Sequence, residues 1–134
     1  FPEGEADLLL AFDPLQCLKK GLAFAREGGT VIMNERALDI RPYPSFTYPT
    51  INQILRYLDE IGVRDVRHLN ASDLAIKETG SIQATNAVML GAAFATGMIP
   101  VREAVFESTI RRLVPVAAVE ANLKAFRVGI EALR

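Results

Sequence analysis

Residues 5–19, EADLLLAFDPLQCLK, decide the fold, because they contain a short apolar strand followed at once by the start of a helix. The apolar stretch Ala6–Phe12 is typical of a strand that is covered on both faces. Asp13 suits the N-cap of a helix and Pro14 suits its first turn, and leucines then recur at helical spacing. We therefore predict a buried strand over Ala6–Phe12 and a helix that starts after Asp13 and ends at the glycine pair 28–29.

A second apolar run, Thr30–Met33, follows the glycine pair and ends at Asn34. Strand, helix and strand within about thirty residues form a parallel crossover unit. A parallel sheet with helices on its faces has the doubly wound, Rossmann-like α/β arrangement. The sequence therefore predicts a partial doubly wound parallel sheet of about three strands flanked by about six helices, within one domain over residues 1–134.

The rest of the chain indicates one more strand and several helices. Prolines and aromatic residues make residues 35–49 an extended connection. The capping-box spacing of Thr50 and Gln53 starts a helix that ends at Gly62. The other predicted elements are a strand over Val63–Leu69 near the sheet edge, a helix from Asn70 to Glu78 stopped by Gly80, a closely packed helix over Ile82–Gly97, a helix opened by Pro100 and a last helix after Pro115.

Composition and charge narrow the classes of function. The chain has 15 Lys plus Arg and 16 Asp plus Glu, with the two signs interspersed, which differs from the basic face of a nucleic-acid-binding protein. No apolar run reaches the roughly 18 residues of a membrane span. Cys17 is the only cysteine and His68 the only histidine, so a disulfide framework or a Cys/His site within one chain is not expected. We expect no nucleic acid or membrane partner and a reducing, cytoplasmic location.

Glycine-rich phosphate motifs are absent, since the sequence contains neither G-x-G-x-x-G nor G-x-x-x-x-G-K. In a doubly wound fold such a turn normally follows the opening strand. Two interpretations stay open at this point. Either the protein has no such site, or these residues are a fragment whose opening unit precedes Phe1. The missing fingerprint also weakens the hypothesis of a nicotinamide-dependent oxidoreductase.

Asp13, Asn34 and Asn86 are the candidate cofactor-binding or partner-facing residues. Ligands of open parallel sheets collect at the C-terminal ends of the strands, and Asp13 and Asn34 follow two predicted strands. The alternatives are that Asp13 only caps its helix and that Asn34 only ends its strand. Asn86 stands on an apolar helix, where a buried amide needs a hydrogen-bond partner, and a structural hydrogen bond is its alternative role. We predict no catalytic and no metal-ligating residue.

Four further polar side chains receive structural interpretations. Thr85 shares the argument for Asn86 in a weaker form. Cys17 is interpreted as a small surface or half-buried apolar residue without a redox role. His68 is expected to face solvent on its strand, with a role as catalytic base as the alternative. Asn122 is expected to form a hydrogen bond between its helix and a loop.

The aromatic residues Tyr43, Phe46 and Tyr48 lie in the proline-rich connection. Aromatic rings on an extended surface segment suit a contact between subunits. The alternative is that they pack on the chain's own helices, and the sequence does not distinguish the two.

Five segments resemble, in order and spacing, the gamma-type domain of 2-oxoacid:ferredoxin oxidoreductases. They are residues 5–19, GGTVIMN at 28–34, the polar and proline-rich connection, TNAVMLGAAFATGMIP at 85–100 and AVEANLKAFRVG at 118–129. The chain is most similar to the small subunit of indolepyruvate oxidoreductases, and the likeness covers essentially all of it. Members of this family carry a further N-terminal unit with a GxGGQG turn. The resemblance thus implies that residues 1–134 correspond to the C-terminal part of such a domain.

The resemblance implies an accessory subunit of an enzyme that oxidises indolepyruvate or a related 2-oxoacid to acyl-CoA and carbon dioxide. It implies a large thiamine-dependent iron–sulfur partner subunit and, indirectly, ferredoxin, with no activity of this chain alone. Thiamine diphosphate, iron–sulfur clusters and coenzyme A are implied for the whole complex and none for this chain by itself. A single cysteine agrees with that, because it cannot ligate a cluster. The alternative is a stand-alone α/β binding or scaffolding module.

The first predicted strand needs a neighbour. A strand of this composition at a sheet edge exposes apolar faces and backbone groups that seek partners. We therefore expect the isolated chain to form a homodimer or a larger homo-oligomer.

Overall fold

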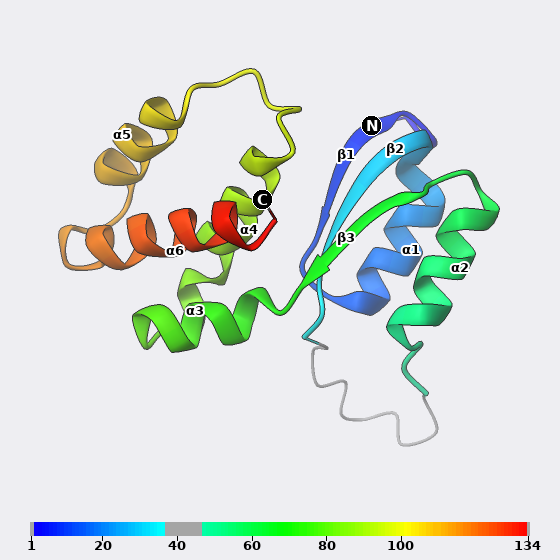
Figure 1. Cartoon of the computed structure of the whole chain (residues 1–134), viewed down its shortest axis with the longest axis horizontal. Helices are drawn as coiled ribbons and strands as arrows, with labels where there is room; N and C mark the ends of the chain where they lie inside the picture. The colour runs from blue at the N-terminus through cyan, green and yellow to red at the C-terminus, as the bar shows by residue number, and fades with distance from the viewer. Residues whose placement is uncertain (1, 37–46, 134) are drawn as a thin grey trace. The chain divides into compact units, whose positions relative to one another are not determined.

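The computed structural model describes residues 2–36 and 47–133, and the chain divides into two compact units, Phe1–Leu69 and Asn70–Arg134. The first unit contains strands β1 (Ala6–Ala11), β2 (Ala25–Asn34) and β3 (Asp65–Leu69) and helices α1 (Pro14–Phe24) and α2 (Ile51–Glu60) (Figure 1). The second contains α3 (Ala71–Thr79), η1 (Ile82–Ala84), α4 (Thr85–Ala95), α5 (Glu103–Leu113), η2 (Val116–Ala118) and α6 (Val119–Ala132). The single domain over residues 1–134 stays a prediction.

The first unit is a parallel sheet with the strand order β1-β2-β3. Helices α1 and α2 cover the same face of this sheet (Figure 1). Their side chains form one apolar core with the strands, and its buried members are Ala11, Cys17, Ala25, Val31, Met33, Ile54, Leu58 and Val63. The predicted α/β class, with three parallel strands and six helices in the described part of the chain, is confirmed.

The end of α1 differs from the prediction, which placed it at the glycine pair 28–29. The helix ends at Phe24, and β2 begins at the next residue, which pairs with Ala6 of β1. Two residues further along β1, Leu8 pairs with Thr30, which lies five residues after Ala25. β2 therefore bulges between these two pairings. Gly28 has a φ of 71°, which glycine adopts without a steric penalty. The glycine pair therefore shapes a bulge inside the strand and does not end the helix.

The helix caps agree well with the sequence. Thr50 and Gln53 form both hydrogen bonds of a capping box at the start of α2. The Asn70 side chain accepts a hydrogen bond from the backbone N–H of Asp73 at 3.0 Å, and Gly80 ends α3 in the left-handed conformation. Two other starts differ from the prediction, because α5 begins after an extended N-cap at Arg102 and the helix predicted from Ile82 opens with the short η1.

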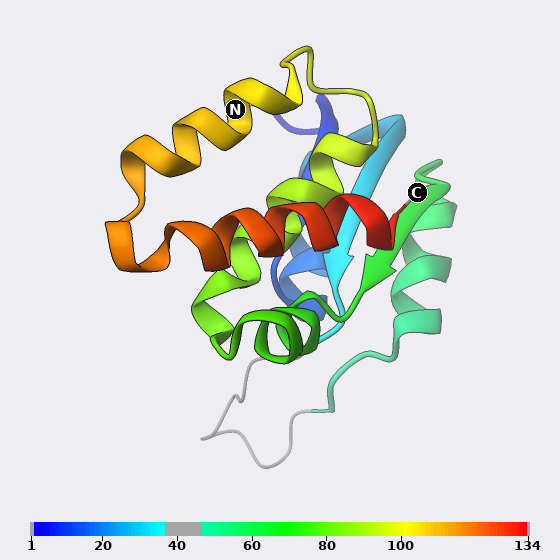
Figure 2. The ribbon, with the colours of Figure 1, turned by 60° about the vertical axis from the view of Figure 1, so that its left-hand side comes forward.

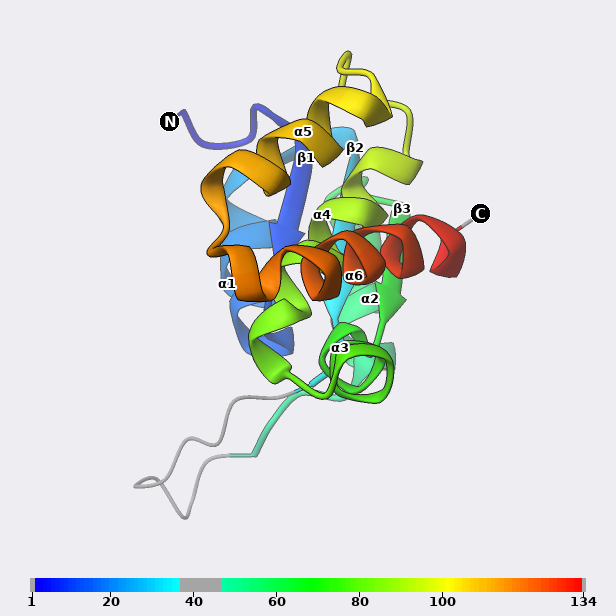
Figure 3. The ribbon, with the colours of Figure 1, turned by 90° about the vertical axis from the view of Figure 1, so that its left-hand side faces the viewer.

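The second unit is built around the crossing of α4 and α6, which lie side by side in two views (Figures 2 and 3). Gly91 of α4 lies against the backbone of Phe126, and Gly129 of α6 lies against the backbone of Val88. The absence of side chains at these two glycines lets the backbones touch, as the closely packed helix predicted over Ile82–Gly97 requires.

Three phenylalanines extend the core of the second unit toward α5. The rings of Phe94 and Phe106 meet edge to face with centroids 5.4 Å apart, and those of Phe106 and Phe126 stack at 5.4 Å. Leu123 and Ile130 of α6 belong to the same core, and both are buried. Within residues 2–36 and 47–133, no helix has the length and apolar character needed to cross a bilayer.

Candidate functional site

Asp13 and Asn34 meet at the C-terminal edge of the sheet. Asp13 follows β1 and Asn34 is the last residue of β2, and each is only 2% exposed. The Asn34 side-chain amide donates a hydrogen bond of 3.2 Å to the carbonyl oxygen of Phe12, the residue before Asp13. The amide therefore ties the end of β2 to the end of β1, and the two sequence candidates share one location. Their role toward a cofactor or a partner stays a prediction.

Asp13 connects three segments of the first unit. Its Oδ1 accepts the backbone N–H of Gln16 at 3.0 Å, and its carbonyl accepts the N–H of Cys17 at 2.8 Å, so it is the N-cap of α1. Its Oδ2 accepts the hydroxyl of Tyr48 at 3.1 Å. One buried carboxylate thus holds both the start of α1 and the segment that leads into α2. The cap was predictable from Asp13-Pro14, whereas no local spacing indicates a contact between residues 35 positions apart.

Tyr48 is half-buried, and its contact with Asp13 lies within the chain. This is the alternative in which the aromatic residue packs on its own domain, and a contact of Tyr48 with another subunit stays a prediction. Tyr43 and Phe46 lie outside the described residues.

The side chains of His68 and Glu35 are in hydrogen-bond contact beside this edge. The His68 Nδ1 lies 2.6 Å from the Glu35 Oε1, and both side chains are a little more than one third exposed. The Glu35 backbone N–H also donates to the Leu69 carbonyl oxygen at 3.0 Å, so the pair continues the junction between β2 and β3. The predicted solvent-facing position of His68 is confirmed, and its carboxylate partner was not predicted. Its possible role as a catalytic base is not tested by this contact.

Cys17 is fully buried in the core of the first unit, which corrects the expected surface or half-buried position. The cause is that the helix turns this residue toward the sheet, next to Val31 and Met33. Burial raises the pKa of the thiol to about 12, and the negative charge of Asp13 acts in the same direction. The thiol is therefore protonated at neutral pH and suits neither nucleophilic attack nor metal ligation.

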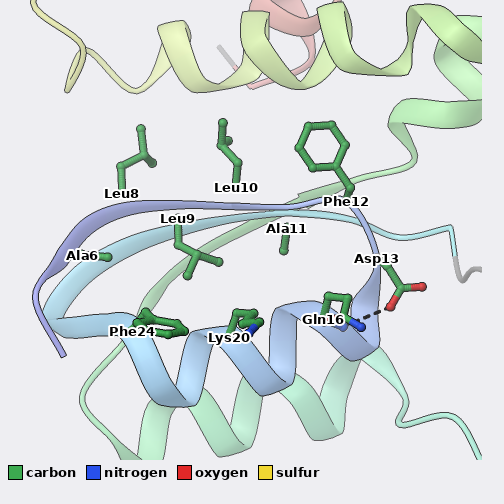
Figure 4. A pocket seen from close by; sticks show the side chains of 10 residues that line it. All are labelled: Ala6, Leu8, Leu9, Leu10, Ala11, Phe12, Asp13, Gln16, Lys20 and Phe24. Carbon is green, nitrogen blue, oxygen red and sulfur yellow. Dashed lines mark hydrogen bonds between the residues drawn. The ribbon is translucent and has the colours of Figure 1, made fainter. Parts of the chain in front are cut away.

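A hollow of about 580 Å³ runs along β1. In Figure 4, Leu9 and Ala11 point toward α1, whereas Leu8, Leu10 and Phe12 point to the opposite side of the strand. The lining residues are Ala6, Leu8, Leu9, Leu10, Ala11, Phe12, Asp13, Gln16, Lys20 and Phe24. Small-molecule sites have volumes of about 300–1,000 Å³ and few polar groups, so the hollow has the size of a ligand site. Asp13 belongs to both the hollow and the C-terminal edge.

The second unit holds the remaining candidates. Asn86 is exposed on α4, so its amide does not need a buried hydrogen-bond partner, and its role at a site stays a prediction. Thr85 is buried, and its hydroxyl donates to the carbonyl oxygen of Ile82 at 2.6 Å. The Asn122 amide donates to the carbonyl oxygen of Ala118 at 2.9 Å; Ala118 ends η2 and is the N-cap of α6, so this bond stays within the start of the helix, and the hydrogen bond to a loop stays a prediction.

Charged side chains gather around a second hollow of about 470 Å³, which α3 and α6 line. Its cations are paired, because the Lys124 Nζ lies 3.1 Å from Glu78 within the hollow and the Arg127 guanidinium lies 2.6 Å from Glu107 of α5. These exposed ion pairs contribute little stability. Across the described ranges, no group of three or more His, Cys, Asp or Glu side chains could hold a metal ion.

Comparison with known proteins gives a consistent result. The family model described as pyruvate ferredoxin/flavodoxin oxidoreductase matches residues 1–132. The chain is 38% identical to the indolepyruvate oxidoreductase subunit IorB of Methanothermobacter thermautotrophicus and 34% identical to the subunit of the same name from Pyrococcus horikoshii. These alignments cover 98% and 99% of this chain, and it spans 66% of the length of each relative.

A solved structure has the same fold. It is the gamma subunit of keto/oxoacid ferredoxin oxidoreductase from Geobacter sulfurreducens, which is 26% identical to this chain with a TM-score of 0.67. The superposition covers 97% of this chain and 65% of that one. The match therefore includes the elements of both units, and with them the strand ends where Asp13 and Asn34 lie.

Proposed function

The chain belongs to the pyruvate ferredoxin/flavodoxin oxidoreductase family, and we propose that it is an accessory subunit of a ferredoxin-dependent 2-oxoacid oxidoreductase. In this proposal the complex oxidises indolepyruvate or a related 2-oxoacid to acyl-CoA and carbon dioxide, and ferredoxin receives the electrons. The chain accompanies a large thiamine-dependent iron–sulfur subunit, has no activity alone and works in the cytoplasm.

One observation carries this proposal. The family match runs through both units, and relatives of 38% and 34% identity are each called a subunit of indolepyruvate oxidoreductase. The fold of the Geobacter gamma subunit supports the same role. A family match of this extent favours the subunit over a stand-alone binding module, because such a module needs only the fold and not the sequence likeness.

The donor atoms of this chain do not fit the cofactors that the proposal gives to the complex. Iron–sulfur clusters need several cysteine thiolates, and the only cysteine, Cys17, is a buried, protonated thiol. A diphosphate with its divalent cation needs a glycine-rich turn or clustered carboxylates. The sequence has no such turn, and the described residues contain no such cluster. We therefore propose that the clusters and thiamine diphosphate are held outside residues 1–134, and we assign coenzyme A to the complex as a whole.

The C-terminal edge of the sheet is the part of this chain that we expect to face the partner. Asn34 fixes the carbonyl of Phe12, whose side chain is 43% exposed although it is large and aromatic. Asp13 fixes Tyr48 and the start of α1 beside it. Aromatic residues on a rigid edge are typical of the centre of a subunit interface. Asn86 of α4 belongs to the same proposal as a second partner-facing or cofactor-facing residue.

Affinity purification of the tagged polypeptide, as its organism makes it, tests the proposal. We expect a large thiamine- and cluster-binding subunit to co-purify. Phe12→Ser should reduce the recovery of that subunit, and Leu113→Ser, which changes a 71% exposed leucine of α5, is the matched control that should not. Purification without such a partner would overturn the proposal and favour the stand-alone binding module.

A further inference from the structure

We draw no further inference here: the strongest candidate, the hydrogen-bonded side-chain pair of His68 and Glu35 beside the C-terminal ends of β3 and β2, belongs to the site already described, and nothing among the described residues shows which group it would bind or which proton it would transfer.

Discussion

Gly91→Ala should destabilise the second unit, because α4 and α6 touch through their backbones at this residue. A Cβ at position 91 would overlap the carbonyl oxygen of Phe126 and lie 2.9 Å from its carbonyl carbon. Carbon atoms attract one another best at about 3.5–4.0 Å, so the helices must separate by roughly 1 Å. Backbone atoms on both sides of the contact leave no flexible side chain that could move away instead.

The cost follows from this displacement. A gap of about 0.5–1 Å removes a quarter to a half of the dispersion energy of the atoms that line it, and the buried Leu123 and Phe126 belong to this interface. Overpacking of a core costs about 1–3 kcal/mol and occasionally more, whereas alanine regains up to about 1 kcal/mol of helix propensity over glycine. We expect a net loss of about 2 kcal/mol, which lowers the urea midpoint by roughly 1 M.

Urea unfolding followed by circular dichroism at 222 nm measures this loss. Gly129→Ala should cost a similar amount, because a Cβ there overlaps the carbonyl oxygen of Val88. The double variant should cost less than the sum of the two, since both changes separate the same helices. Gly21→Ala is the control, because its Cβ meets only the end of the Leu58 side chain, at 2.7 Å. The end of that side chain can shift, and alanine gains up to about 1 kcal/mol of helix propensity over glycine, so we expect a clearly smaller loss than at position 91.

The reasoning would be refuted by variants at positions 91 and 129 that both unfold at the urea midpoint of the natural chain. It would equally be refuted if Gly21→Ala lost as much stability as Gly91→Ala, because the distinction between backbone and side-chain contacts would then have no consequence.

Three further predictions concern the first unit. Asp13→Ala should lower the free energy of unfolding, measured by urea titration, by about 1–2 kcal/mol. Asp13→Asn can still accept the Gln16 N–H, so its free energy of unfolding should stay close to that of the natural chain. Cys17 should react with iodoacetamide at pH 8 only after unfolding, because raising its pKa from 9.0 to about 12 makes the thiolate about a thousandfold scarcer; rapid labelling of the folded chain would contradict this. The hydrogen bond from Arg67 holds the pKa of Asp65 below 3.8. The contribution of the ionised Asp65 to the free energy of unfolding is therefore complete above that pH and is lost as the pH falls below it. The stability difference between the natural chain and Asp65→Asn should thus be larger at pH 6 than at pH 2, by less than about 1 kcal/mol at this exposed pair.

The elements that local rules govern were predictable from the sequence. Asp13 before Pro14 marks the start of α1, Thr50 with Gln53 forms a capping box, and the apolar runs around them become the parallel strands β1 and β2. The end of α1 was not predictable in the same way, because paired glycines can end a helix or allow a bulge in a strand. Pairing of Ala25 with Ala6, a contact distant in sequence, decides for the bulge.

The candidate site shows the same division. Topology alone brought Asp13 and Asn34 to one edge, since parallel strands end on the same side of a sheet. The contact of Tyr48 with Asp13 and that of His68 with Glu35 depend on where a long connection returns to the sheet, and no residue spacing encodes this. The exposure of Asn86 could not be read from the sequence, because the apolar residues of this helix do not show which of its sides stays exposed.

The most direct test of the proposed subunit role is 2-oxoacid-dependent reduction of a viologen dye. The assay compares the complex that co-purifies with this protein and the same large subunit prepared from cells that lack it. The account predicts that indolepyruvate with coenzyme A drives dye reduction by the complex, that the large subunit alone loses this activity, and that adding the protein back restores it. An unchanged rate in the absence of the protein would contradict the central claim.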